Sequence, residues 1–215
     1  MGKGLIITLP RFDQVTEYFY DFSEEIVRSA ERKGFKIKKL VAEKANKKEF
    51  KKVISKLDYP LVVLNGHGNE RSIAGHENKI ILKSGENDSL IKDKITYTRA
   101  CSAADILGKN CVKKGDGCFI GYRKPFNFLA NTEEYASPLK DKTAKLFLEP
   151  SNLVPISLIK GNNALHAHEN SKKKILKNIV KVIRDGGDDY LAIAQTLWSN
   201  YENQVLEGNE LAKID

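Results

Sequence analysis

The chain has 215 residues with a formal net charge of +8, and 41% of its residues are hydrophobic. This length suits one domain, and this composition suits an ordinary buried core. No apolar stretch reaches the ~18 residues of a transmembrane helix, and the first residues lack a signal-peptide cleavage site. We therefore expect a cytosolic (cytoplasmic) protein without a membrane partner.

Charge and cysteine content argue against two common kinds of site. Lysines are spread among 28 acidic residues, which is typical of solvated helix faces rather than of a nucleic-acid-binding patch. Cys101, Cys111 and Cys118 form no CxxC motif, so neither a disulfide framework nor a thiolate zinc site is expected. We expect no metal or organic cofactor, and no nucleic-acid partner.

The first half of the chain alternates strand and helix patterns. Short, uncharged, β-rich runs are typical of strands buried on both faces of a parallel sheet. The stretch 66–92 is mainly polar loop with a small apolar element at 79–82. This order predicts a three-layer α/β fold with a mostly parallel central sheet. The expected strands are 5–9, 35–41, 60–64, 95–100 and 118–121. One expected helix ends at Gly34, and two others cover 47–57 and 103–113.

The second half changes character. Residues 122–138 are irregular, and residues 139–207 favour helices. A helix that ends at Gly186-Gly187 has an apolar stripe opposite lysines. No linker is evident, so we expect one domain over 1–215, with a sheet core (1–121) followed by a pocket loop and a helical C-terminal part (122–215). The stripe consists of Ile175, Leu176, Ile179, Val180 and Ile183.

His67 and Cys101 each follow a buried strand pattern. In open α/β sheets, ligands bind just beyond the carboxyl ends of the strands. A base and a sulfur nucleophile at that edge can form the catalytic dyad of a cysteine hydrolase. Ser102 and Asp105 match a helix-capping pattern, so a helix dipole is expected to favour the Cys101 thiolate. The N–H groups of Gly68 and Cys101 are candidates for an oxyanion hole.

The other histidines and cysteines have structural interpretations. Cys111 and Cys118 fall in a helix and a strand, so we expect both in the core. His76 lies in the polar loop, where an exposed or loop-structuring role is expected. His166 and His168 are two residues apart and share no helix face, which argues against a zinc site.

The segments "LVVLNGHGNE", "KITYTRACSAADILG" and "GDGCFIGY" resemble the caspase-like cysteine peptidases (caspases, metacaspases, gingipains and bacterial CHAT-domain proteases), and the gingipain/CHAT branch looks closer than the animal caspases. The resemblance covers about residues 5–125. It implies a caspase–haemoglobinase-like fold, with the catalytic His after the third strand and Cys after the fourth. His67 and Cys101 match those places.

The chain departs from animal caspases in two respects. The signature Q-A-C-[RQG]-G is replaced by Arg99-Ala100-Cys101-Ser102-Ala103, and His67 lies 34 residues before Cys101 rather than about 50. We therefore do not carry the aspartate specificity of the animal caspases over to this chain. The resemblance places the substrate pocket near residues 10–13 and 122–126. Asp13 could select a basic side chain, whereas Arg11 or Arg123, beside Tyr122, could select an acidic one; surface ion pairs are the alternative for each charge.

These observations favour a regulated prokaryotic cysteine endopeptidase that cleaves protein or peptide substrates, with a protein activator or regulator as a further expected partner. Two alternatives remain open. The chain could be a non-catalytic partner-binding module on the same fold, or a cysteine amidase or transpeptidase that acts on small amides.

Overall fold

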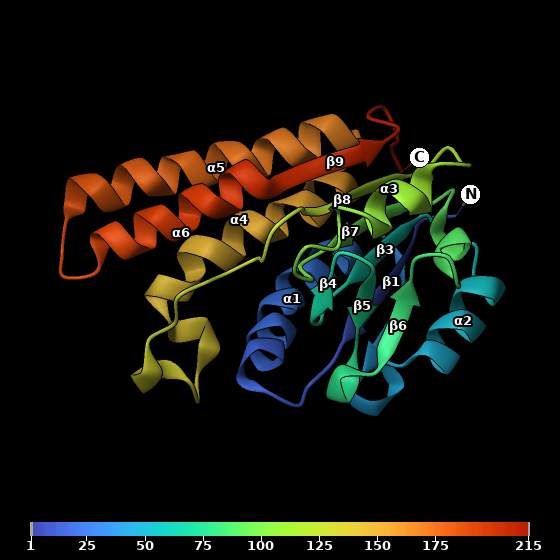
Figure 1. The fold of residues 1–215 in the computed structure, drawn as a ribbon, viewed down its shortest axis with the longest axis horizontal. Coiled ribbons are helices and arrows are strands. Elements are labelled where there is room, and N and C mark those ends of the chain that lie inside the picture. Colours follow the sequence, from blue (N-terminus) through green and yellow to red (C-terminus); the bar gives the residue numbers. More distant parts are fainter. Residues whose placement is uncertain (1, 215) are drawn as a thin grey trace.

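The computed structural model describes residues 2–214, and a six-stranded sheet runs through it (Figure 1). Neighbouring strands are parallel except for the last one, which pairs antiparallel at one edge. This confirms the α/β class and the mostly parallel sheet. Across the sheet the strands are β2 (Lys36–Val41), β1 (Gly4–Leu9), β3 (Leu61–Leu64), β7 (Ile95–Thr98), β8 (Cys118–Tyr122) and β9 (Gln204–Gly208).

Helices cover both faces of this sheet. Successive strand residues point to opposite faces, so Leu5 and Ile7 pack into one buried cluster and Ile6 packs into the other. The first cluster includes residues of α1, α4 and α5, and the second includes residues of α2 and α3. The helices are α1 (Gln14–Arg32), α2 (Lys47–Lys56), α3 (Leu107–Val112), α4 (Lys142–Ile159), α5 (Ala164–Asp185) and α6 (Tyr190–Asn203).

Two stretches differ from the sequence-based prediction. The polar stretch 66–92 folds into a small antiparallel sheet rather than mainly loop. Its strands are β4 (Gly68–Asn69), β5 (Ser72–Ala74) and β6 (Ile80–Lys83). The end of the expected helical region is strand β9, because Val205 and Leu206 pair with Gly121 and Ile120 along the edge of β8.

The apolar stripe of α5 is only half buried. Ile175 and Ile179 pack against α4 and α6, together with Val182, which the prediction omitted. Val180 and Ile183 instead face solvent, because α6 covers only one flank of α5. In Figure 1, α5 and α6 lie side by side and extend well beyond the sheet. Within residues 2–214, no helix is both long enough and apolar enough to cross a membrane.

A buried arginine joins the carboxyl ends of the central strands. Arg99 is 1% exposed, and its guanidinium donates to Asn65 Oδ1 at 2.8 Å and to Ser23 Oγ at 2.7 Å. Asn65 in turn exchanges hydrogen bonds with Thr8 at the end of β1. Burial lowers the pKa of Arg99. This network fixes the strand ends from which the candidate site is built.

Candidate active site

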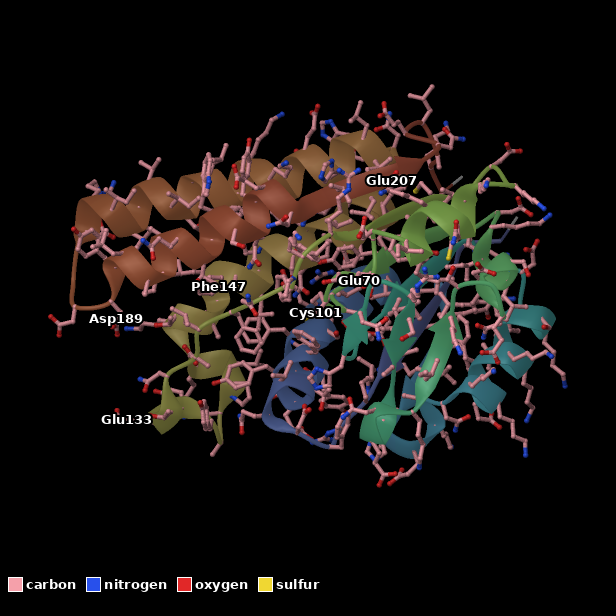
Figure 2. All side chains as sticks on the ribbon, in the orientation of Figure 1. Glu70, Cys101, Glu133, Phe147, Asp189 and Glu207 are labelled. Carbon is pink, nitrogen blue, oxygen red and sulfur yellow. The ribbon has the colours of Figure 1, made fainter. Side chains whose placement is uncertain are left out.

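His67 and Cys101 lie at the carboxyl ends of adjacent strands. β3 and β7 pair in parallel from Leu61–Ile95 to Leu64–Thr98, so the residues after them leave the sheet at the same edge. Gly68 packs against the Cys101 backbone, since a Cβ atom at Gly68 would lie 3.1 Å from the Cys101 carbonyl oxygen. Figure 2 places Cys101 where the sheet meets the C-terminal helices. The structure thus brings the His67 loop and Cys101 together.

Asp13 is the direct partner of His67. Its Oδ2 atom lies 2.5 Å from His67 Nε2, and its Oδ1 atom accepts the Thr16 N–H at 2.8 Å, which caps α1. Partial burial opposes ionisation of Asp13, but the hydrogen bonds from His67 and Thr16 hold its pKa below the usual value. The carboxylate is therefore ionised at neutral pH. With Nε2 held by Asp13, Nδ1 is the ring nitrogen left to exchange a proton with a thiol.

A second histidine supports the loop that carries Asp13. His76 is 7% exposed, and its Nδ1 atom accepts the Arg11 N–H at 3.3 Å. The Phe12 ring lies edge-on between His67 and His76, with ring centroids 5.9 and 5.5 Å apart, respectively. His76 is therefore buried rather than exposed, and the loop-structuring role expected for it is confirmed.

The Cys101 thiol lies beneath the chain that follows β8. Its Sγ atom donates to the Phe126 carbonyl at 3.8 Å. The backbone N–H of the following residue, Ser102, donates to the Lys124 carbonyl. Residues 123–127 are held in turn by the end of the chain. Asn127 exchanges two hydrogen bonds with the Asn200 side chain of α6, and Arg123 pairs with Glu207 of β9 at 2.7 Å. We call residues 123–127 the covering segment.

The covered thiol is expected to react slowly at neutral pH. Burial raises the pKa of Cys101, although backbone hydrogen bonds at Phe126 and at Cys101 itself partly oppose the shift. A raised pKa lowers the thiolate fraction, so the rate of alkylation by iodoacetamide should still be rising above about pH 8.5, where a free thiol is half ionised. Peptide mapping by mass spectrometry would follow Cys101, with glutathione in the same tube as the reference. A rate already at its plateau below pH 7 would contradict this and indicate a thiolate–imidazolium pair.

The prediction of a helix directly after Cys101 is wrong. Residues 101–106 form turns, and α3 begins only at Leu107. Ser102 adopts a left-handed conformation with φ +56°, which directs the chain away from a helix, and its N–H is engaged by Lys124. The Ser102/Asp105 pattern therefore marks a turn, with Asp105 N–H donating to the Ser102 carbonyl. A helix dipole does not lower the pKa of Cys101 here.

The predicted oxyanion donors lie at this same edge. Ala74 N–H donates to the His67 carbonyl, which makes Gly68 and Ile73 a non-hydrogen-bonded pair of the β4–β5 ladder. The ladder therefore leaves the Gly68 N–H unpaired, beside the backbone of Cys101. The oxyanion hole of Gly68 and Cys101 stays a prediction.

Gly66 sets the direction in which the chain enters His67. Its φ is +145°, and a Cβ there would lie 1.9 Å from the Ala74 carbonyl oxygen. Gly66→Ala should therefore lower the free energy of unfolding by about 3 kcal/mol or more. Gly34→Ala is the matched control, since Gly34 also has a positive φ but a Cβ there would meet no atom within 4 Å; it should cost only about 1 kcal/mol. Urea denaturation would measure both, and equal costs would contradict the steric argument.

The four residues proposed for the substrate pocket are all engaged within the protein. Arg11 pairs with Glu17 at 2.8 Å and lies over the Tyr20 ring, and Arg123 pairs with Glu207. Arg11 and Arg123 thus each form a surface ion pair, which was the alternative to a role in selecting an acidic side chain. Asp13 holds His67, so it is not free to select a basic side chain. Tyr122 is 1% exposed and accepts a hydrogen bond from Gln204, so it lines the core rather than an open pocket.

Sequence reasoning missed the role of Asp13. The signal available was its position after the first strand, because β1 lies beside β3 in the sheet. Strand order changes direction between these two strands, which is where open α/β sheets form a crevice. The covering segment was missed as well, since the bonds to Asn200 and Glu207 join residues far apart in sequence.

No protein-family model matches this chain, and no curated protein matches it. Within residues 2–214, no group of three or more His, Cys, Asp or Glu side chains is placed to hold a metal ion.

Proposed function

We propose that the chain is a caspase-like cysteine endopeptidase with the three-layer caspase–haemoglobinase architecture, using Cys101 as nucleophile and His67 as base. The observation that carries this proposal is the Asp13–His67 hydrogen bond at the sheet edge beside Cys101. An ionised carboxylate on one ring nitrogen orients the imidazole and stabilises its protonated form.

The reaction requires each of these groups in turn. His67 Nδ1 takes the thiol proton, and Cys101 Sγ attacks the peptide carbonyl carbon. The Gly68 and Cys101 N–H groups stabilise the oxyanion that forms. As the C–N bond breaks, His67 returns the proton to the leaving amine. His67 then deprotonates a water molecule that hydrolyses the thioester, which releases the acid and restores the thiol.

Cys101 is only partly exposed, and its Sγ donates to the Phe126 carbonyl of the covering segment; burial raises the pKa of its thiol. These observations support a regulated peptidase. Displacement of the covering segment would remove the Phe126 carbonyl from Sγ and lower the desolvation that raises the pKa of Cys101. The same observation favours a second candidate, a partner-binding module on this fold in which the thiol does no chemistry.

A mixed peptide library incubated with purified protein in H₂¹⁸O would test the proposal. Hydrolysis of the thioester should give internal cleavage products with one ¹⁸O in the new carboxyl group, detected by mass spectrometry. Products joined to added amines without ¹⁸O would indicate a transpeptidase instead. A chain that leaves all peptides intact, and whose Cys101 resists alkylation at every pH, would be a binding module.

A further inference from the structure

The positive charge of the chain is concentrated at one edge of the sheet. Residues 31–56 contain eleven Lys or Arg and three Glu, a net charge of +8, which equals that of the whole chain. They include the edge strand β2 and the helix α2. Among residues 2–214, only Lys47 and Lys52 of these eleven cations have an ion-pair partner. We call residues 31–56 the basic edge, and its charge is mostly uncompensated.

The lysines of β2 and of α2 belong to the same side of the sheet. Leu40 of β2 packs in one buried cluster with Phe50 and Val53 of α2. Alternate residues of a strand share a face, so the exposed Lys36 and Lys38 project from the face that α2 covers. A ligand at the edge of β2 therefore meets these two lysines directly, within the field of the α2 cations. The exposed lysines of α2 are Lys48, Lys51, Lys52 and Lys56.

The backbone of β2 is open to a further strand. β2 pairs in parallel with β1, and it is the last strand of the sheet on that side. An edge strand presents unpaired N–H and C=O groups along its outer side. Ile37 and Val41, on the face opposite α2, are only partly buried against the core, so an added strand would also cover apolar surface.

We propose that β2 binds an extended acidic segment of a protein partner, which adds a further strand to the sheet. Backbone hydrogen bonds to the free edge would hold the segment and set its register. Asp or Glu at alternate positions would pair with Lys36 and Lys38 across the two strands, and residues between them would cover Ile37 and Val41. The proposal concerns binding alone and does not depend on peptidase activity.

Protection against self-association explains only part of the basic edge. Lysines on an edge strand keep copies of a chain from pairing, since two β2 edges side by side would place like charges opposite one another. That role accounts for Lys36, Lys38 and Lys39. It gives no reason for the lysines of α2, because a helix has no strand edge to protect.

Other anionic partners use less of what this surface offers. The phosphates of a duplex need cations alone and would leave the free backbone edge to water. Single-stranded nucleic acids stack on exposed aromatic rings, but Phe35 and Phe50, the two aromatic residues of the basic edge, are buried. Interfacial binding to an anionic membrane requires apolar side chains that enter the bilayer, whereas the exposed residues of β2 are all lysines.

Binding of a labelled peptide in which Glu alternates with Val or Thr tests the proposal. Fluorescence anisotropy with the full chain should report binding that weakens as salt rises, because exposed charges are screened. An isomer with the same composition but all Glu at one end should bind about tenfold more weakly. So should the peptide N-methylated at two adjacent central residues, which loses hydrogen-bond donors on both of its edges. Hydrogen exchange over residues 36–41 should slow in the complex.

Variants then locate the interaction. Lys36→Glu combined with Lys38→Glu should weaken binding about tenfold, because two attractive cross-strand pairs become repulsive. Lys140→Glu combined with Lys142→Glu is the matched control, since these lysines have the same spacing and are also exposed, and this variant should bind normally.

Three results would overturn the proposal. The first is absence of peptide binding, or peptide binding that the Lys36/Lys38 change leaves unaltered. The second is equal binding of the isomer or of the N-methylated peptide, which would show that charge alone suffices. The third is tighter binding of a DNA duplex or of anionic vesicles than of the peptide, lost in the Lys36/Lys38 variant, which would assign the basic edge to a nucleic acid or a membrane.

Discussion

Replacing Cys101 with alanine should lower peptide cleavage by about 10⁴-fold or more, because loss of the nucleophile leaves only binding and oxyanion stabilisation. The side chain is small and Sγ donates to the Phe126 carbonyl at a long 3.8 Å, so the fold should tolerate the change. Cleavage of the peptide library by equal amounts of the two proteins measures the effect.

Cys111 supplies the matched control for that experiment. It is a buried thiol in α3, and burial raises its pKa far above the ordinary value. Cys111→Ala should therefore retain activity while losing some stability from the small cavity it creates. Equal activity of wild type and Cys101→Ala would remove Cys101 from the mechanism.

Replacing Asp13 with asparagine should lower kcat/KM by about 10³-fold, because the charge that stabilises protonated His67 is lost and the tautomer is no longer fixed. Asparagine caps a helix as well as aspartate does, so α1 should stay intact and Tm should hardly change. Kinetics and thermal unfolding of the same preparation would separate these two effects.

A second substitution at Asp13 separates its effect on His67 from its role as the cap of α1. Asp13→Ala removes both the His67 partner and the cap on Thr16, so it should lose activity like the asparagine variant and also about 1 kcal/mol of stability. If Asp13→Asn keeps near wild-type activity while Asp13→Ala does not, Asp13 acts only as a helix cap.

The central strands could be predicted from sequence because their runs of uncharged, β-prone residues fit only a doubly covered sheet. Runs such as Leu61–Leu64 are buried at every position. The positions of His67 and Cys101 followed from the ends of these runs. The position of Asp13 beside His67 did not, because it depends on which strands are neighbours, and a sequence does not give strand order.

Other errors have similarly local causes. The Ser102/Asp105 pattern is shared by helix caps and turns, and the tertiary contact with Lys124 decides between them. The apolar stripe of α5 predicts the helix but not which of its residues a neighbouring helix covers, and Val180 of that stripe lies in solvent. Strand β9 needs the free edge of β8 to form.

The bonds that join the covering segment to Asn200 and Glu207 can form only late in synthesis of the chain. A ribosome completes His67 and Cys101 well before Asn200 and Glu207, and folding during translation proceeds from the N-terminal side. The strands that lead to His67 and Cys101 can therefore assemble while the covering segment still lacks its bonds to Asn200 and Glu207. A nascent chain, or one truncated before Asn200, would present a less protected thiol than the finished protein.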